Sequence, residues 1–218
     1  MADDTAGLIE ALGHSSAHVV GMSLGGMVAQ CLAIKHPERV RSLNLIMTTP
    51  GEIWANTPTI RGLSALMSRP ARNRDAVIRH QVKTFQQIGG TRHNSPPELI
   101  EKFAAQQFDR GMNPRGFARQ FAAVIAAEGR LPKLAKLRVP TQVIHGSVDP
   151  LVRPLGGRLL ASAIPGARFD LIAGMGHDIG PSIWPRVIDR IHENSKREAQ
   201  TLPERGKISN FVRRPVEV

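Results

Sequence analysis

Residues 17–33 read AHVVGMSLGGMVAQCLA, and this stretch decides which fold the chain adopts. A β-branched run at 17–20 predicts a short buried strand, and the pattern then changes to an alanine-rich helix over about 24–35. Between the two lies a single serine, Ser23, in a glycine-rich turn. The segment RVRSLNLIM (39–47) predicts a second strand. Strand, helix and strand in this order indicate a parallel sheet.

The same alternation returns near the end of the chain. TQVIHG (141–146) and RFDLIAG (168–174) predict two further strands, with a helix over 155–164 between them. A last helix is expected over 185–194. A short helix is also expected near the start, over 4–12. The sequence therefore predicts an α/β fold, mostly a parallel sheet with helices on both faces.

Strand signals vanish between residues 51 and 138, where helical patterns take over. DAVIRHQVKTFQQI (75–88) is amphipathic, and Asn113 followed by Pro114 predicts a capped helix. Ser95 and Glu98 have the spacing of a capping box. We therefore predict the following domains: a core formed by 1–50 and 139–194, a helical cap at 51–138, and a flexible basic tail at 195–218.

Composition limits the class of protein. The chain has 218 residues, of which 41% are hydrophobic, so it can bury a sizeable core. Its single cysteine, Cys31, excludes an internal disulfide framework and is expected to pack as a small hydrophobic residue. No apolar run reaches the roughly 20 residues of a membrane span. We expect a cytoplasmic protein with no membrane partner.

The formal net charge of +11 raises the question of nucleic-acid binding. Most of the excess lies in the predicted cap, which has 15 basic and 6 acidic residues. The arginines there are scattered singly, and the chain has no tyrosine to offer as a stacking platform. We therefore expect a solvated basic surface and no nucleic-acid partner, with steering of an anionic substrate as the weaker alternative.

Gly21-Met22-Ser23-Leu24-Gly25 fits the G-x-S-x-G nucleophile elbow. In such a turn the serine is strained, and side chains at the positions of Gly21 and Gly25 are expected to clash. The turn lifts the hydroxyl to the carboxyl end of the sheet, where open parallel sheets bind ligands. At the helix N-terminus, the Leu24 N–H faces any negative charge that forms nearby, so Leu24 is the expected oxyanion donor.

A nucleophilic serine needs a base, and the base needs an orienting acid. Asp149 lies just past the third predicted strand, and His177 lies in a glycine-rich loop past the fourth. The order Ser23, Asp149, His177 is the one that the elbow predicts. Each residue also has a plain structural interpretation: a helix cap for the serine, a turn for the aspartate, and an ordinary loop histidine. The combination in these three loops favours a catalytic triad.

Four other residues compete for the acid and base roles. Glu52 lies several residues beyond its strand, and Asp178 adjoins His177, so neither is well placed to orient the imidazole. His145 lies within a predicted strand and is expected to pack beside the site. His36 looks like the surface end of a helix. No metal cluster, P-loop lysine or dinucleotide fingerprint is present, so we expect no metal and no cofactor.

The chain resembles the α/β-hydrolase superfamily. The resemblance rests on VVGMSLGGMVAQCLAIKHPERVRSLNLI, PTQVIHGSVDPLVRP and IPGARFDLIAGMGHDIGP, and covers most of residues 1–194. These segments look like those of small serine esterases, including the group similar to aclacinomycin methylesterase. The resemblance implies hydrolysis of a small-molecule carboxylic ester under a helical cap. Serine as the nucleophile argues against the dehalogenases and epoxide hydrolases that resemble this fold.

Members of the superfamily usually begin with four strands and a helix before the elbow, whereas Ser23 follows only 22 residues here. We therefore expect an N-terminally truncated fold that lacks the loop with the second oxyanion donor. The strand at 17–20 would then be an open apolar edge available for self-association. The alternative function is a catalytically impaired or silent fragment. Lactone, thioester, lipid, carbon–carbon bond and peroxidase chemistry all stay open.

Overall fold

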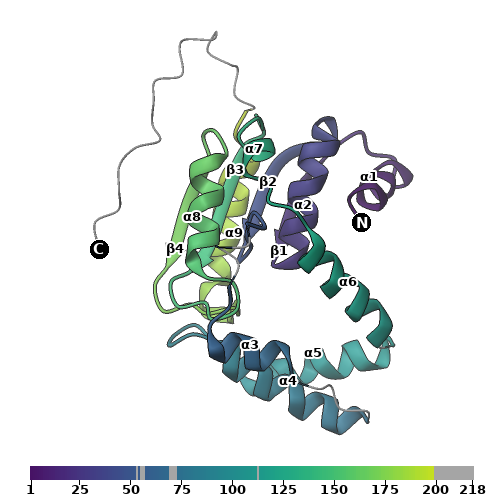
Figure 1. The fold of residues 1–218 in the computed structure, drawn as a ribbon, viewed down its shortest axis with the longest axis vertical. Coiled ribbons are helices and arrows are strands. Elements are labelled where there is room, and N and C mark those ends of the chain that lie inside the picture. The colour runs from purple at the N-terminus through teal and green to yellow at the C-terminus, as the bar shows by residue number, and fades with distance from the viewer. Residues whose placement is uncertain (53, 55–56, 69–72, 112, 199–218) are drawn as a thin grey trace.

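The computed structural model describes residues 1–198 except 53, 55–56, 69–72 and 112. Four strands form one sheet in the order β1-β2-β3-β4, and every neighbouring pair is parallel. Because each strand follows the predicted segment, the predicted parallel α/β sheet is confirmed (Figure 1). The strands are β1 (Ala17–Met22), β2 (Val40–Ile46), β3 (Thr141–Gly146) and β4 (Arg168–Ile172).

Helices cover both faces of the sheet. One face is covered by α2 (Leu24–Lys35), α7 (Leu131–Leu134) and α8 (Pro154–Ala163), and the other by α9 (Trp184–Ser195). Helix α1 (Ala2–Ala11) packs against α2 rather than against the sheet. Two short 3-10 helices precede β2 and α9, namely η1 (Pro37–Arg39) and η3 (Pro181–Ile183).

Alternation along the central strands separates two hydrophobic cores. Leu43 and Leu45 of β2 face the larger core beneath α2 and α8, whereas Ile46 joins the smaller core beneath α9. In β3, Val143 and Ile144 divide between the two cores in the same way. This period of two is the one that side chains follow along a strand. A strand that is buried on both faces therefore has a nearly continuous run of apolar residues in its sequence.

A buried amide at the end of α9 ties that helix to the sheet. Asn194 is 1% exposed, and its Nδ2 donates to the backbone oxygens of Leu43 and Pro140 at 3.1 and 3.2 Å. Nδ2 also lies 3.1 Å from Asn44 Oδ1. A buried polar group is tolerated only when it is bonded, so these contacts fix how α9 lies on the sheet.

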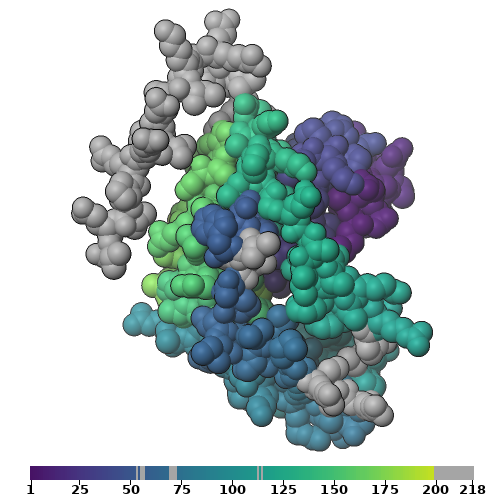
Figure 2. Space-filling view, viewed as in Figure 1, coloured from purple at the N-terminus to yellow at the C-terminus, as the bar shows by residue number. Residues whose placement is uncertain are grey.

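Four helices between β2 and β3 form a lobe at the carboxyl end of the sheet (Figures 1 and 2). They are α3 (Ile60–Leu66), α4 (Arg74–Ile88), α5 (Pro97–Asp109) and α6 (Pro114–Ala126). The predicted cap at Asn113 is confirmed, because its side chain accepts a bond from the Gly116 N–H at 2.9 Å. The predicted capping box is wrong, because α5 begins at Pro97 without a side-chain cap.

The far end of the predicted cap segment packs with the core. Leu134 of α7 is fully buried in the larger core cluster, and Leu137 is packed beside it. The division into a core and a helical cap stays a proposal. The last residues of the predicted cap segment 51–138 pack with the core instead of with the other cap helices. The predicted tail falls largely at 199–218, which lies outside the described residues.

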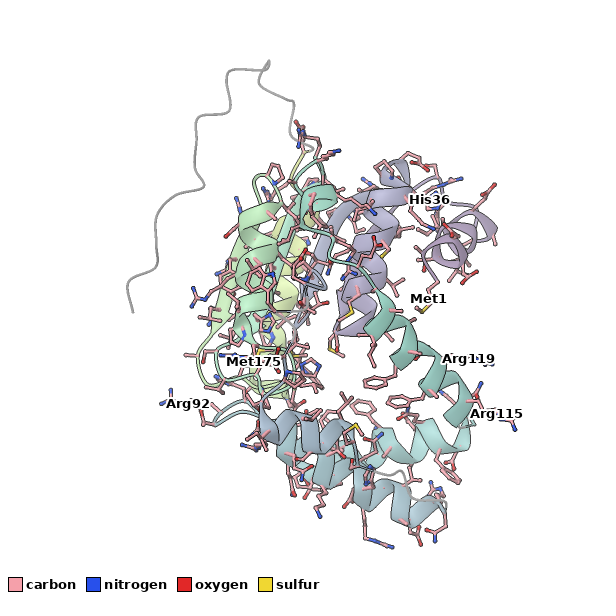
Figure 3. The ribbon with its side chains drawn as sticks, viewed as in Figure 1. Met1, His36, Arg92, Arg115, Arg119 and Met175 are labelled. Carbon is pink, nitrogen blue, oxygen red and sulfur yellow. The ribbon has the colours of Figure 1, made fainter. Side chains whose placement is uncertain are left out.

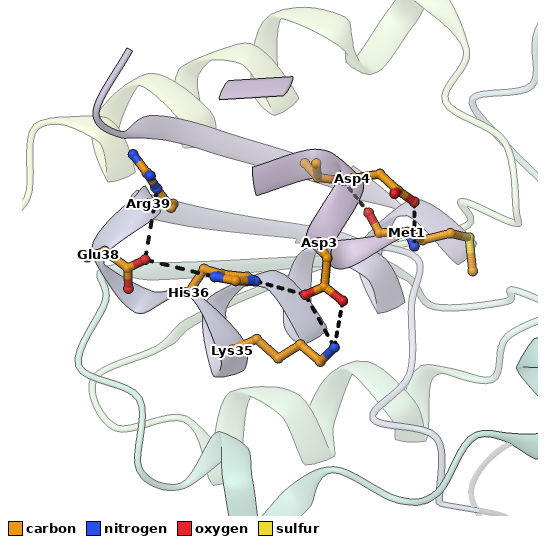
Figure 4. Close-up of polar contacts among 8 residues, drawn as sticks. Met1, Asp3, Asp4, Lys35, His36, Glu38 and Arg39 are labelled. Atoms are coloured by element: carbon orange, nitrogen blue, oxygen red, sulfur yellow. Dashed lines mark hydrogen bonds and ion pairs between the residues drawn. The ribbon is translucent and has the colours of Figure 1, made fainter. Parts of the chain in front are cut away.

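Polar contacts join α1 to the end of α2 (Figure 4). Asp3 accepts bonds from Lys35 Nζ and lies 2.9 Å from His36 Nε2. These hydrogen bonds, from His36 first and then from Lys35, lower the pKa of Asp3 to about 2. His36 thus forms the surface end of α2, as expected from the sequence. Since the carboxylate is exposed, its effect on stability is small.

Candidate active site

Ser23 lies in a strained turn between β1 and α2. Its φ of 51° and ψ of −120° place a residue with a side chain where L-residues are uncommon. The turn is held because the Ser23 N–H donates to Ile46 O at 2.9 Å and Thr48 Oγ1 donates to Ser23 O at 2.8 Å. Such strain costs about 1–3 kcal/mol and tends to cluster at functional sites.

The glycines of this turn differ in whether a side chain would fit at their positions. A Cβ at Gly21 would lie 2.5 Å from Gly25 O, and one at Gly26 would lie 2.6 Å from Thr48 Cγ2. A Cβ at Gly25 would meet no described atom within 4 Å. The expected clash is therefore found at Gly21, whereas the steric reason given for Gly25 is wrong. The close approach falls one residue later, at Gly26, where α2 packs on the loop after β2.

Ser23, Asp149 and His177 come together at the carboxyl end of the sheet. His177 Nδ1 lies 2.7 Å from Asp149 Oδ2, and His177 Nε2 lies 3.0 Å from Ser23 Oγ. A carboxylate only accepts hydrogen bonds, so Nδ1 carries the proton and donates it to Asp149. Nε2 is then free to accept a hydrogen bond from the serine hydroxyl. This tautomer is the one in which an imidazole can take a proton from serine.

The aspartate is oriented by its own loop. Asp149 Oδ1 accepts bonds from the Leu151 and Val152 N–H groups, both at 2.9 Å, which leaves Oδ2 for the imidazole. Asp149 is 3% exposed, so its charge is compensated almost entirely by these bonds. Sequence reasoning identified the residue but not the two backbone donors that hold it.

His145 packs beneath this loop, as expected, and adds a contact that sequence reasoning missed. It is fully buried, and its Nε2 donates to Val152 O at 2.8 Å while lying 3.6 Å from Asp149 Oδ2. Its Nδ1 is buried with no hydrogen-bond partner among the described residues. Burial lowers the pKa of His145 below its ordinary value of 6.5. The side chain is therefore neutral and supports the acid loop from below.

Loops of the helical lobe hold the aspartate and histidine loops in place. The Thr59 N–H donates to Pro150 O at 2.9 Å, and the His177 N–H donates to Ile88 O at 2.8 Å. Gly90 lies so close to the backbone at 174–176 that a side chain there would collide with it. The paired glycines at 89–90 were the available sequence signal for this close approach, because only glycine lets two backbones come so near.

The competing acids have other partners. Asp178 accepts bonds from Ser95 N and Ser95 Oγ at 2.6 and 2.8 Å, which ties the histidine loop to the start of α5. This explains why Ser95 does not cap the helix. Glu52 accepts a bond from the Leu131 N–H at 3.3 Å. Neither carboxylate is among the hydrogen-bond partners recorded for His177.

A cavity of about 430 Å³ opens beside the serine, between the sheet and the helical lobe. Ser23 and Leu24 form its floor, and its walls come from α3, α6 and the loop after β3. Leu24 is the first residue of α2, so its N–H has no acceptor within the helix and is free to bind a ligand oxygen. Among the described lining residues besides Ser23, Gln120 alone has a polar side chain.

The described lining of this cavity includes no basic side chain. Arg115 and Arg119 point outward from α6, and Arg92 points outward at the other side of the lobe (Figure 3). In the described part of the chain, no helix is both long enough and apolar enough to cross a bilayer. Within those same residues, no three His, Cys, Asp or Glu side chains are grouped so as to hold a metal ion. The absence of cofactor and nucleic-acid partner stays a prediction.

Comparison with known proteins gives a consistent result. A model of the alpha/beta hydrolase fold family matches residues 1–180. The chain is similar to pimeloyl-(acyl-carrier protein) methyl ester esterase of Chromobacterium violaceum, with 28% identity over 76% of this chain and 65% of that protein. It is similar to rhodomycin D methylesterase DauP of Streptomyces sp. strain C5, with 25% identity over 81% of this chain and 66% of that protein. The chain therefore spans just under two thirds of either relative.

Solved structures share the fold. An esterase, RhEst1, from Rhodococcus sp. ECU1013 superposes with a TM-score of 0.68 at 22% identity. The match covers 89% of this chain and 71% of that structure. At this identity the likeness concerns the fold alone.

The glycine contacts lead to a paired prediction. Gly26→Ala should destabilise the fold by about 1–3 kcal/mol, because the new methyl group overlaps Thr48. Gly25→Ala should leave the stability unchanged or raise it by about 1 kcal/mol, because alanine is the better helix former. Denaturant unfolding of the two variants measures both effects. Equal destabilisation by the two changes would contradict the packing described for this turn.

The neutral, buried His145 leads to a prediction about pH. Because burial lowers the pKa of His145 in the folded state, the unfolded state binds the proton more readily over the pH range between that lowered pKa and 6.5. Over that range His145 should make stability fall by up to about 1.4 kcal/mol for each pH unit below 6.5. His145→Gln, which can still donate to Val152 O, should flatten this slope in urea unfolding. The exposed His14→Gln serves as control, and an unchanged slope in His145→Gln would refute the assignment.

Proposed function

We propose, from the premise that this chain belongs to the α/β-hydrolase fold family, that it is a serine hydrolase of small-molecule carboxylic esters. One observation carries the proposal: the Nε2 atom of His177 lies 3.0 Å from Ser23 Oγ while its Nδ1 atom is held by Asp149. This is the contact by which an imidazole removes a proton from an attacking hydroxyl.

The proposed reaction has two halves. Ser23 Oγ attacks the ester carbonyl carbon as His177 Nε2 takes the hydroxyl proton. The tetrahedral intermediate then collapses, the bond to the alcohol oxygen breaks, and Nε2 returns the proton to the leaving alcohol. Water, deprotonated by the same nitrogen, then attacks the acyl-enzyme; the bond to Ser23 Oγ breaks, the acid is released, and Nε2 returns the proton to Oγ. Asp149 stabilises the imidazolium in both halves by accepting from Nδ1.

Charge on the carbonyl oxygen needs donors in the transition state. The Leu24 N–H at the start of α2 is free and adjoins the nucleophile, so we assign it as an oxyanion donor. Positive charge at a helix N-terminus favours the same oxygen. A second donor is not identified among the described residues. Loss of one such donor costs about 10²–10³ in kcat where it has been measured.

The relatives support an ester as the substrate. One is a methyl ester esterase and another a methylesterase by name, and the chain covers 65% and 66% of their lengths. The apolar cavity beside Ser23 suits the carbon chain of an ester. We further propose that the helical lobe serves as the cap that roofs this pocket, as expected from the sequence. A cytoplasmic location stays a prediction from the sequence.

The alternative is a catalytically impaired or silent protein that associates through its sheet. β1 is an edge strand of the described sheet, and its Val20 and Met22 side chains are 50% and 52% exposed. An open apolar edge can pair with a strand of another chain. We therefore keep self-association through β1 as a proposal, to be separated from activity by experiment.

A fluorophosphonate probe tests the proposed nucleophile, because it reacts only with an activated serine. The folded chain should be labelled once, at Ser23. Ser23→Ala should abolish labelling, and His177→Ala should slow it by about 10⁴-fold or more. Labelling is followed by in-gel fluorescence and intact mass.

Ser195→Ala, in α9 and outside the lining of the cavity, serves as the matched control and should label like the parent chain. Circular dichroism confirms that each variant is folded. A folded parent chain that fails to react, and elutes as an oligomer, would favour the silent alternative over the hydrolase.

A further inference from the structure

A second cavity of about 500 Å³ lies within the helical lobe, next to the one that holds Ser23. The two cavities share Leu66, Phe117 and Leu151 in their walls, so they adjoin across these three side chains. The second cavity has no part in the proposed ester cleavage. Its lining shows what it could bind.

The two cavities differ in chemistry. The first is walled almost entirely by apolar side chains from α3 and α6. The second is lined on several sides by uncharged groups that can donate or accept hydrogen bonds, namely Ser68, His80, Gln81, Thr84, Gln107 and Asn113. A ligand that spans both would thus be apolar near the serine and polar at its far end.

Hydrogen bonding fixes the role of His80. Ser68 Oγ donates its one proton to Ala65 O at 2.6 Å. The contact of 3.3 Å between Ser68 Oγ and His80 Nε2 therefore requires the imidazole to donate. With Nε2 protonated in the neutral ring, Nδ1 is an acceptor, and it has no partner among the described residues. His80 can thus accept a hydrogen bond from a ligand hydroxyl or N–H.

Amide groups supply the complementary donors. The side chains of Gln81 and Gln107 have no hydrogen-bond partner within the described part of the chain. Asn113 Oδ1 is occupied by the Gly116 N–H, which leaves its Nδ2 as a donor. A hydroxyl group is the simplest ligand that both donates to an imidazole nitrogen and accepts from an amide.

Charge argues against an ionic ligand. Within the described part of the chain, the residues that line the second cavity include no Lys, Arg, Asp or Glu. A carboxylate or ammonium group placed there would lose water without gaining a counter-charge from these described residues, which is strongly unfavourable. A plain methyl group would leave the polar lining without partners.

We propose that the second cavity is the subsite for an uncharged hydroxyl group at the far end of the substrate's carbon chain. This inference rests on the proposed function, since the ester itself would lie against Ser23. It narrows the substrate class to esters whose acyl or alkyl chain is apolar along its length and hydroxylated at its end. His80 and Gln81 are the proposed specificity-determining residues.

Matched esters test the proposal. Methyl esters of six-, eight- and ten-carbon acids, each ending in methyl, hydroxyl or carboxylate, are compared by kcat/KM. A parallel arm uses acetates of the corresponding alcohols, so that either side of the ester can reach the subsite. At the chain length that reaches the second cavity, the hydroxyl ester should be preferred to the methyl ester by about 10-fold, and the carboxylate should react slowest. No hydroxyl preference at any length, or a preference for the carboxylate, would overturn the proposal.

Substitutions in the lining of the second cavity test whether the preference for hydroxyl esters arises there. His80→Leu and Gln81→Leu should each remove most of the hydroxyl preference, while hydrolysis of p-nitrophenyl acetate, which is too short to reach the subsite, stays unchanged. Gln87→Leu, a matched change in the same helix outside the lining, should keep the preference. A hydroxyl preference that survives both His80→Leu and Gln81→Leu would contradict the assignment.

Two further readouts separate this inference from the proposed function. Failure to hydrolyse p-nitrophenyl acetate would count against the hydrolase itself. Calorimetry measures how tightly the same esters bind to the Ser23→Ala variant, which cannot cleave them. The affinity should be highest for the hydroxyl ester, lower for the methyl ester and lowest for the carboxylate. Equal binding of the three esters would overturn the subsite even if the chain proves to be a hydrolase.

Discussion

The parallel register of the four strands is the constraint on which the candidate site depends. Since β1 to β4 all run in one direction, the loops that follow β1, β3 and β4 open at the same edge of the sheet. Ser23 and His177 are 154 positions apart in sequence yet lie within hydrogen-bond distance. The strained turn after β1 and the backbone bonds to Asp149 then set the final orientation. Burial keeps the supporting His145 neutral beneath them.

Much of this arrangement could be predicted because the signals are local. Strand and helix patterns depend on periods of a few residues, and they identified the four strands and the parallel order. The glycine turn and the positions of Asp149 and His177 just past predicted strands were enough to bring three distant residues into one hypothesis. The structure places those three side chains in contact.

Other features could not be predicted because they depend on which surfaces meet. Nothing near Ser95 in sequence reveals that its side chain bonds Asp178 instead of capping a helix. The close approach at Gly26 depends on Thr48, which comes from a different element. The bond from His145 to the acid loop and the polar cavity within the helical lobe likewise depend on tertiary packing.

The central claim is that Ser23 becomes acylated with His177 as its base. Rapid-quench mass spectrometry during turnover of p-nitrophenyl acetate tests this claim most directly. The account predicts a transient gain of one acetyl group per chain, located on the peptide that contains Ser23, which His177→Ala prevents from accumulating. Turnover by a folded chain without any acyl adduct, or an adduct on a different residue, would contradict it.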